Sequence, residues 1–322
     1  MADRYWVGGT GTWDNSLTTN WSATSGGSGG ASVPTTSDNV IFDAGSDSGA
    51  NFTVTHSTSA ACLSLTASAL DYQMTLTGTT TLTIAGSLTL PATNFVKGGS
   101  GALLFNGATT RTITTNGVTL SGSVTINAAT STITLGSALT LSAGRTITFT
   151  AGTLLDFAGY NVTCGTFTST LASTRSLTLG TGTLTCTDGT STAAFTLTGA
   201  TNLTLSAASS TILMTGATAK TFGGNGYTFG VLKNAGAGAM TIAGSNTFSE
   251  LGNTVQPCTV SLTSGTTQTV TTFSLQGTAG NLVTLNAVTA GTAATLSKAS
   301  GTVNASYLSI RDNTPTGGAK WV

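Results

Sequence analysis

Short segments in which apolar and polar residues alternate run through most of this chain, and they constrain its fold more than any other feature. They extend from about residue 52 to 310 and are broken by Gly, Ser, Ala and Asn. Examples are SVTIN (123–127), TITLG (132–136), TITFT (146–150) and SLTLG (176–180). A period of two is typical of strands with one buried face, and β-branched Thr and Val favour extended backbone. The chain is therefore predicted to be all-β.

The segments also recur at a loose interval of about 18 to 20 residues. Leu177 in SLTLG matches Phe195 in FTLTG one interval later, and Leu184 matches Leu203 in the same way. Such a repeat, with two or three strands in each period, indicates a parallel β-helix, or β-solenoid, in which each inward side chain stacks on its equivalent in the next coil. About 250 residues at some 19 per coil give roughly 13 coils.

The alternative fold is a pair of tandem β-sandwiches, which also contain short strands at regular spacing. Sandwich strands are joined by hairpins, for which Asn-Gly and Asp-Gly are the strongest turn signals. These dipeptides occur at residues 106, 116, 188 and 225, too few to turn every pair of strands. The gaps between segments are also too short for crossover helices. The solenoid is favoured.

The ends of the chain differ from its middle, as a solenoid requires, because each open end exposes unpaired strand edges that need a cap. Residues 1–50 hold three of the four Trp and five of the ten acidic residues, and the last stretch regains Arg311, Lys320 and Trp321. We therefore expect an N-terminal cap or attachment segment at 1–50, a solenoid at 51–305 and a C-terminal cap or tail at 306–322.

Composition argues against several classes of partner. Charged residues make up 6% of the chain and the net charge is zero, so no basic surface is expected for nucleic acid. No apolar run approaches the roughly 18 residues that a membrane span needs. The start, MADRYWVGG, lacks the basic and apolar regions of a secretory signal, so we expect the protein to be made in a cytoplasm and either to stay there or to leave by a route that needs no signal, such as cell lysis.

The cysteines indicate no metal or cofactor site. Cys62, Cys164, Cys186 and Cys258 form no CxxC pair, and the chain has one histidine, His56, so a zinc site is not expected. Cys164 and Cys186 occupy alternating apolar positions, which predicts small buried thiols. The spacing neither requires nor excludes disulfides.

Acidic residues and histidine give no recognisable catalytic cluster. The separation of Asp156 from Asp188 is not a whole number of coils of the expected length, so they need not share a face as a glycosidase pair would. We expect Asp156 on a solvated strand face, Asp188 in a turn and His56 at the surface. FDAGSDSGAN (42–51) lacks the EF-hand spacing and is expected to be a plain loop. No catalytic, cofactor or metal residue is predicted, and the protein is expected not to be an enzyme.

The opening RYWVGGTGTWDNSLTTNW (4–21) concentrates large aromatic residues in one place. It contains Trp6, Trp13 and Trp21, and Phe42 follows in NVIF (39–42). These aromatics could line a ligand site, close the first coil or form a docking face. No acids or donors cluster among them as in a ligand cage, so they are interpreted as a plug of the first coil or, if exposed, a docking face.

The same stretch resembles the start of many β-solenoid proteins. The matching pattern is Trp6-x-Gly8-Gly9-x-Gly11-x-Trp13, then Asn20-Trp21, then Pro34-x-x-x-Asp38-x-Val40-x-Phe42. Such openings occur in passenger regions of bacterial surface proteins and in structural proteins of bacteriophage particles, where the motif begins the solenoid and its aromatics close the first coil. The tail, YLSIRDNTPTGGAKW (307–321), is similar to the end of such modules.

The resemblance implies a function as well as a fold. A start without a signal fits a component of a phage virion, made in the host cytoplasm and released by lysis. We expect a non-enzymatic structural protein: a head decoration or cement protein, or a tail fibre or spike. Its expected partners are other capsid or tail proteins and further copies of itself, with a trimer as the expected oligomer. The alternatives are an adhesin that binds host surface glycans and a polysaccharide depolymerase.

Overall fold

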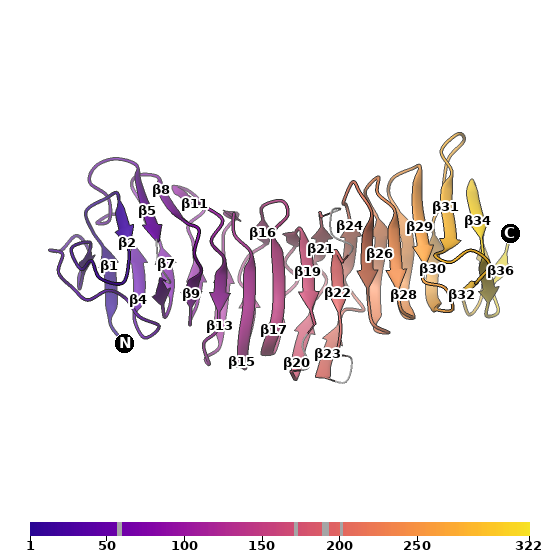
Figure 1. Cartoon of the computed structure of the whole chain (residues 1–322), viewed down its shortest axis with the longest axis horizontal. Helices are drawn as coiled ribbons and strands as arrows, with labels where there is room; N and C mark the ends of the chain where they lie inside the picture. Colours follow the sequence, from indigo (N-terminus) through magenta and orange to yellow (C-terminus); the bar gives the residue numbers. More distant parts are fainter. Residues whose placement is uncertain (57–59, 171–172, 189–192, 200–201) are drawn as a thin grey trace. The chain divides into compact units, whose positions relative to one another are not determined.

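Strands account for the regular structure, and the described residues contain no α-helix, hence none that could span a membrane (Figure 1). The computed structural model describes residues 1–56, 60–170, 173–188, 193–199 and 202–322. The chain forms a parallel β-solenoid of about 12 turns, which confirms the predicted fold class. It divides into two compact units, unit 1 (Met1–Tyr160) and unit 2 (Asn161–Val322), each described by itself below.

Unit 1 contains strands β1 to β17. On one side of its coils lie β2 (Gly11–Trp13), β5 (Phe52–His56), β8 (Met74–Gly78), β11 (Phe95–Lys97), β14 (Thr119–Leu120) and β16 (Leu139–Leu141). The remaining strands are β1 (Asp3–Trp6), β3 (Trp21–Ser22), β4 (Asn39–Phe42), β6 (Ala61–Cys62), β7 (Leu65–Ala67), β9 (Leu82–Ile84), β10 (Leu88–Thr89), β12 (Leu103–Phe105), β13 (Arg111–Thr114), β15 (Val124–Leu135) and β17 (Thr146–Asp156).

Unit 2 contains strands β18 to β36. One sheet comprises β18 (Val162–Cys164), β21 (Thr183–Cys186), β24 (Thr211–Met214), β26 (Thr228–Asn234), β28 (Asn246–Asn253), β30 (Thr267–Ser274), β32 (Ala294–Ser297) and β35 (Asn313–Thr316). The others are β19 (Thr166–Ser169), β20 (Arg175–Thr178), β22 (Phe195–Leu197), β23 (Leu203–Ser206), β25 (Lys220–Gly223), β27 (Met240–Ala243), β29 (Cys258–Leu262), β31 (Val283–Ala287), β34 (Leu308–Arg311), β33 (Thr302–Val303) and β36 (Lys320–Trp321).

Successive coils pair in parallel, with like residues in register. Phe52 in β5 aligns with Met74 in β8, and Met74 aligns with Phe95 in β11. Among the strands that the structure describes, the one antiparallel pair is β1 with β3. The β-sandwich alternative is therefore wrong, because its strands would pair mainly through antiparallel hairpins.

The coils are longer and less regular than the sequence predicted. The step from Thr228 to its aligned residue Thr247 equals the expected period, whereas the step from Thr183 to Thr211 is much longer. The expected matches of Leu177 with Phe195 and of Leu184 with Leu203 are wrong. Leu177 aligns with Leu205, and Leu184 aligns with Ile212. Each coil here has several strands of similar TLTL sequence, so the sequence comparison matched different strands of the coil.

Alternation places one residue type inside and another outside. In unit 2, Phe167, Phe195 and Phe222 stack in successive coils, with ring centroids 5.6 Å and 4.8 Å apart. Each fully buried Phe or Leu contributes about 1.5–3 kcal/mol, which no strand this short gains alone. Outward positions carry Thr and Ser, such as Thr163 aligned with Thr185. Stacking of coils therefore supplies the core, and hydroxyl side chains cover the outer face.

Candidate functional site

The four predicted aromatics, Trp6, Trp13, Trp21 and Phe42, meet inside the first coil, and none of them is exposed to solvent. Trp21 lies between the other two indoles, with centroids 5.1 Å from Trp6 and 5.2 Å from Trp13, both edge to face. Phe42 lies 6.3 Å from Trp6 and 6.5 Å from Trp13. Edge-to-face pairs at these distances are favourable beyond the area that they bury. The cluster fills the interior at this end of unit 1.

The glycines between the tryptophans make this packing possible. Gly8 and Gly9 have φ angles of 91° and 71°, a left-handed backbone that glycine adopts without strain. Gly11 is required for a different reason, since a Cβ atom there would lie 2.9 Å from the Trp6 ring. The indole of Trp6 donates a hydrogen bond of 2.8 Å to the Gly9 carbonyl, which fixes the turn against the ring. Gly8, Gly9 and Gly11 thus each have a local geometric role in the packing of Trp6.

Strand β3 covers the outer edge of the first coil. β1 pairs in parallel with β4 on one edge, and antiparallel with β3 on the other, where Trp6 aligns with Trp21. The N–H of Val7 donates to the Asn20 carbonyl at 2.9 Å, and the Asn20 side chain donates to the Val7 carbonyl at 3.0 Å. The edge of β1 that would invite another strand is therefore occupied by the chain itself.

His56 is buried, so its expected surface position is wrong. It occupies the third inward position of β5, after Phe52 and Val54, and aligns with Trp13 of the preceding coil. Burial, together with the nearby Lys97, lowers the pKa of His56 to about 4. Its Nδ1 lies 3.2 Å from the Thr80 hydroxyl, and its Nε2 has no hydrogen-bond partner. At neutral pH the ring is therefore uncharged.

Four basic side chains also lie in the interior, which sequence reasoning missed: Lys97, Arg111, Arg175 and Lys220. Their polar atoms are bonded mainly to backbone carbonyls of the coil corners. The Lys220 ammonium donates to the carbonyls of Gly216 and Gly238 at 2.8 Å and 2.7 Å, and burial lowers its pKa to about 8. The four residues occupy inward positions of the alternating segments FVK, RTIT, RSLT and KTFG, respectively. The alternating pattern alone could therefore have predicted their burial.

The acidic residues do not gather. No group of three or more His, Cys, Asp or Glu that could hold a metal occurs in the part of the chain that the structure describes. Asp156 accepts a hydrogen bond from the Ala158 N–H. In the 42–51 loop, Asp43 and Asp47 accept hydrogen bonds from the N–H groups two residues on, as in ordinary turns. Cys164 and Cys186 are buried, as predicted, and so are Cys62 and Cys258; none of the four forms a disulfide.

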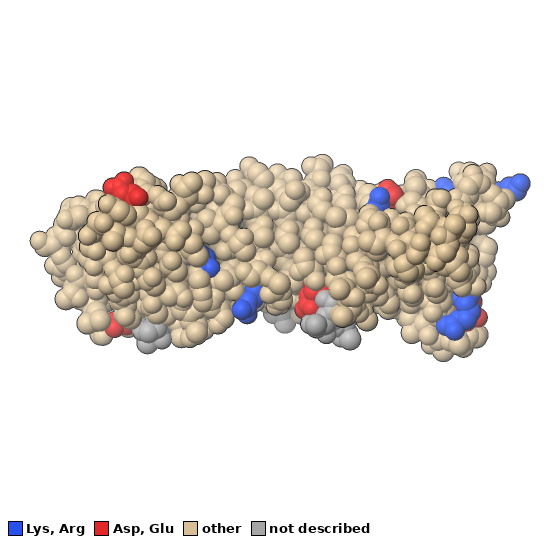
Figure 2. All heavy atoms as spheres, turned by 90° about the horizontal axis from the view of Figure 1, so that it is seen from above, with Lys and Arg blue, Asp and Glu red and all other residues tan. Residues whose placement is uncertain are grey.

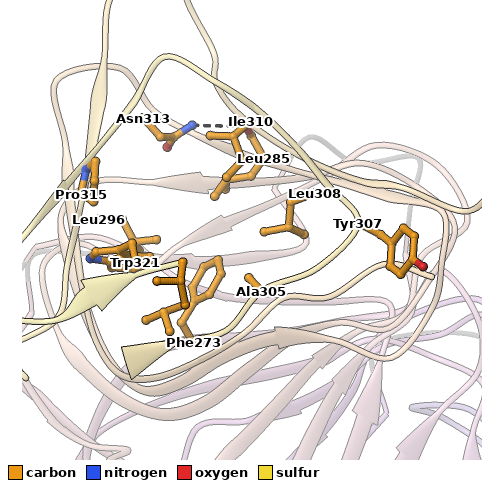
Figure 3. A pocket seen from close by; sticks show the side chains of 12 residues that line it. Phe273, Leu285, Leu296, Ala305, Tyr307, Leu308, Ile310, Asn313, Pro315 and Trp321 are labelled. Carbon is orange, nitrogen blue, oxygen red and sulfur yellow. Dashed lines mark hydrogen bonds between the residues drawn. The ribbon is translucent and has the colours of Figure 1, made fainter. Parts of the chain in front are cut away.

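A hollow of about 390 Å³ lies at the C-terminal end of unit 2. It is lined by apolar side chains from β34, from the segment before it and from the end of the chain, among them Tyr307, Leu308, Ile310 and Trp321 (Figure 3). Trp321 packs edge to face on Phe273 at 5.5 Å. Ile310 is 58% exposed, whereas Leu285, its aligned residue in the preceding coil, is buried. The last coil is therefore only partly closed.

No family model, curated protein or solved structure matches this chain.

The described ionisable groups are dispersed or buried, whereas two surfaces are specialised: a closed aromatic end in unit 1 and an open apolar end in unit 2. The open end was not predicted as a site, although YLSIRDNTPTGGAKW was singled out as a cap or tail. An apolar hollow of this size at a sheet end is the kind of surface that receives a ligand or another chain.

Proposed function

We propose that this protein is a non-enzymatic structural component of a bacteriophage particle, a β-solenoid that decorates the head or projects from the tail. Its partners would be other capsid or tail proteins and further copies of itself, with a trimer as the expected assembly. The protein would be made in the host cytoplasm and reach its place by assembly into the virion.

The single observation that carries this proposal is the structure of the opening motif. The residues that resemble the start of phage and bacterial-surface solenoids, Trp6 to Trp13, Trp21 and Phe42, are those that build the closed first coil. Glycines, aromatics and the Asn20 contact all serve this closure. Function follows from sites and not from folds alone, so the motif supports the proposal more than the solenoid does.

The stacked interior adds a physical argument. Each coil is bonded to the next by a parallel ladder, and its interior is filled by side chains such as Phe195 and Phe222. A solenoid stabilised in this way needs few charged residues and little sequence complexity to stay rigid, and rigidity suits a structural spacer or clamp. Glycan binding along the coils is less well supported, because the exposed aromatics Tyr72 and Tyr160 of unit 1 come from separate loops.

Immunogold labelling of intact particles tests the proposal. An antibody raised against residues 1–322 should label purified virions of the phage that carries the gene, and virions from a deletion of that gene should stay unlabelled. Labelling of the head would indicate decoration, and labelling of the tail would indicate a fibre or spike. Purified virions that contain none of the protein would overturn the proposal.

An assay of enzymatic activity separates the remaining alternatives. Incubation with host capsule or lipopolysaccharide should release no new reducing ends, and a glycan array should show no binding. Release of reducing ends would establish a depolymerase, and binding without cleavage would establish a glycan-binding adhesin. Either result would replace the structural role proposed here.

A further inference from the structure

The hollow at the C-terminal end of unit 2 has two polar atoms without partners. The indole N–H of Trp321 and the amide oxygen of Asn313 are both buried from water, and neither has a hydrogen-bond partner. Both residues line the hollow (Figure 3). A buried donor and a buried acceptor are each costly to leave unpaired. A polypeptide segment carries both matching groups, a carbonyl for the indole and an N–H for the amide oxygen.

The same end has a strand with one unpaired edge. Among the described strands, β34 pairs with β31 alone, where Leu308 aligns with Val283 and Ile310 with Leu285. Val283 and Leu285 are buried, whereas Ile310 is largely exposed because no further coil stacks on it. In contrast, β35 carries Pro315, which lacks an N–H and suits an edge strand. The uncovered apolar surface is thus centred on Leu308, Ile310 and the neighbouring Trp321.

Charge restricts what can cover this surface. From residue 294 onward the side chains include three cations, Lys298, Arg311 and Lys320, against one carboxylate, Asp312. Asp312 already pairs with Arg311 at 3.3 Å. Figure 2 shows blue side chains on the C-terminal coils, with red ones beside some of them, and red side chains on the N-terminal coils. A partner with apolar and acidic character is favoured, and a second copy of this cationic end is disfavoured.

The N-terminal segment of the same protein has that character. Residues 1–50 contain five aspartates against one arginine. Apart from Met1, Leu17 is the one large apolar side chain that the described part of this segment exposes, at 45%. The loop that presents it is held by Asp14, whose carboxylate accepts hydrogen bonds from the N–H groups of Ser16 at 2.8 Å and Leu17 at 2.7 Å. Leu17 is therefore an apolar side chain on a fixed, acidic loop.

We propose that Leu17 of one copy inserts into the C-terminal hollow of a second copy, so that copies associate head to tail. Asp14 then brings a carboxylate to an end of the chain that carries three cations and one carboxylate, and a backbone carbonyl of the 14–17 loop supplies a partner for the Trp321 indole. Because two different surfaces meet, the contact is heterologous, and each added copy leaves one N-terminal loop and one hollow free. It is a separate contact from that of the expected trimer, which would enter the measurements below as the repeating unit in place of the single chain. The proposal depends on the two ends alone and not on location in a virion, so labelling experiments that contradict the virion role leave it intact.

Sedimentation velocity over a range of concentrations of the 1–322 chain tests this contact. The parent chain should form dimers and longer species as concentration rises, and raising the salt from about 0.05 M to about 0.5 M should weaken them, because salt screens exposed charges. Leu17→Gln and Ile310→Asp should each weaken association at least tenfold. Both side chains are exposed, so the fold should be unaffected, as circular dichroism can verify. Leu282→Asp, at a side chain 48% exposed that does not line the hollow, is the matched control and should associate like the parent.

A mixture of the two defective chains gives the decisive result. The Ile310→Asp chain retains an intact N-terminal loop, and the Leu17→Gln chain retains an intact C-terminal hollow. An equimolar mixture should therefore form dimers and stop there. If Ile310→Asp abolishes association while Leu17→Gln does not, another surface occupies the hollow and the proposal is wrong. A parent chain that stays monomeric at all concentrations, or a mixture that forms no dimers, also overturns it.

Discussion

The first coil of unit 1 and the last coil of unit 2 meet the same physical requirement in different ways. Both must end a stack of parallel strands. The first coil ends with three buried indoles and with β3 laid along the outer edge of β1. The last coil ends with a half-buried Trp321, an open hollow and β34, which is paired on one edge only. Buried polar atoms without partners occur at both ends, at the Trp13 and Trp21 indoles and at Trp321 and Asn313, so the difference lies in the apolar hollow and in the strand that covers β1.

The difference shows what closing a solenoid demands. Aromatic bulk alone is insufficient, since both ends contain tryptophan. Both ends also have glycines with left-handed backbone, Gly8 and Gly9 at one and Gly317 at the other. The N-terminal end has, in addition, a strand that reverses direction to cover β1, whereas nothing antiparallel covers β34 among the described strands. Because β2 still pairs with β5 alone among these strands, the two ends differ both in the covering of one strand edge and in the interior, which indoles fill at one end and a hollow interrupts at the other.

The largest expected effect comes from removing one indole at each end. Trp21→Ala should lower the free energy of unfolding by about 3–5 kcal/mol, because a fully buried Trp leaves a cavity between Trp6 and Trp13. Trp321→Ala should cost about 1–2 kcal/mol, because its ring is only half-buried and contacts Phe273 on one side. Urea unfolding followed by far-ultraviolet circular dichroism measures both. Equal losses would contradict the contrast between a closed and an open end.

Acid should act on the N-terminal end first. His56, the one histidine of the chain, aligns with Trp13 directly beneath the aromatic cluster. Because the folded pKa of about 4 lies below the ordinary 6.5, the unfolded chain binds the additional proton between these values. Stability is therefore lost as the pH falls from about 6.5 to about 4, by roughly 2–3 kcal/mol in all.

Hydrogen exchange at different pH values locates this loss. Amides of β2 and β5 should exchange faster at pH 4.5 than at pH 7 after correction for the intrinsic rate, and those of β31 and β34 should not. His56→Gln, which cannot take up a proton in this range, should remove the difference. Uniform acid sensitivity in both units would show that His56 does not control the N-terminal end.

A smaller effect tests the glycine in the opening motif. Gly11→Ala places a Cβ atom 2.9 Å from the Trp6 ring and should cost about 1–2 kcal/mol. Gly223→Ala is the matched control, since the nearest atom to its Cβ would lie 3.5 Å away, and it should change stability by less than about 0.5 kcal/mol. Urea midpoints compare the two. If both are tolerated equally, the first coil packs less tightly than the indole contacts imply.

The sequence predicted the inside and outside of strands better than the ends of the solenoid. Alternation alone identified segments such as SLTLG and the buried cysteines, because side chains of a strand point to opposite faces. His56 was placed at the surface because of its residue type, and Arg111, Arg175 and Lys220 were not considered for the interior, although the alternating pattern puts all four at inward positions. The buried cations are accommodated because corner carbonyls accept their N–H groups, and no spacing rule reveals such corners.

Coil length and the hollow depend on information that a local pattern lacks. The segments that contain Leu177, Phe195 and Leu205 share one alternating pattern, so the pattern could not identify the true neighbour of Leu177 in the next coil. The opening motif was recognisable because its tryptophans and glycines are close in sequence. The hollow combines Phe273, Leu285 and Trp321, which are far apart in the chain, and it exists because no coil stacks on β34. A non-local surface of this kind is visible only in the structure.

The smallest expected change in stability concerns the charges of the open end. Arg311 and Asp312 form an ion pair at 3.3 Å, and the Arg311 side chain is 55% exposed. Ion pairs in water at a surface contribute little, so Arg311→Gln should change the free energy of unfolding by less than about 0.5 kcal/mol. The same change should weaken head-to-tail association and reduce its dependence on salt, because it removes one of three cations facing an acidic loop. Unfolding and sedimentation measured on one preparation compare the two effects. If Arg311→Gln lowers the free energy of unfolding as much as Trp321→Ala does, the charges stabilise the last coil itself. The contrast between a closed first coil and a last coil available for contact would then be wrong.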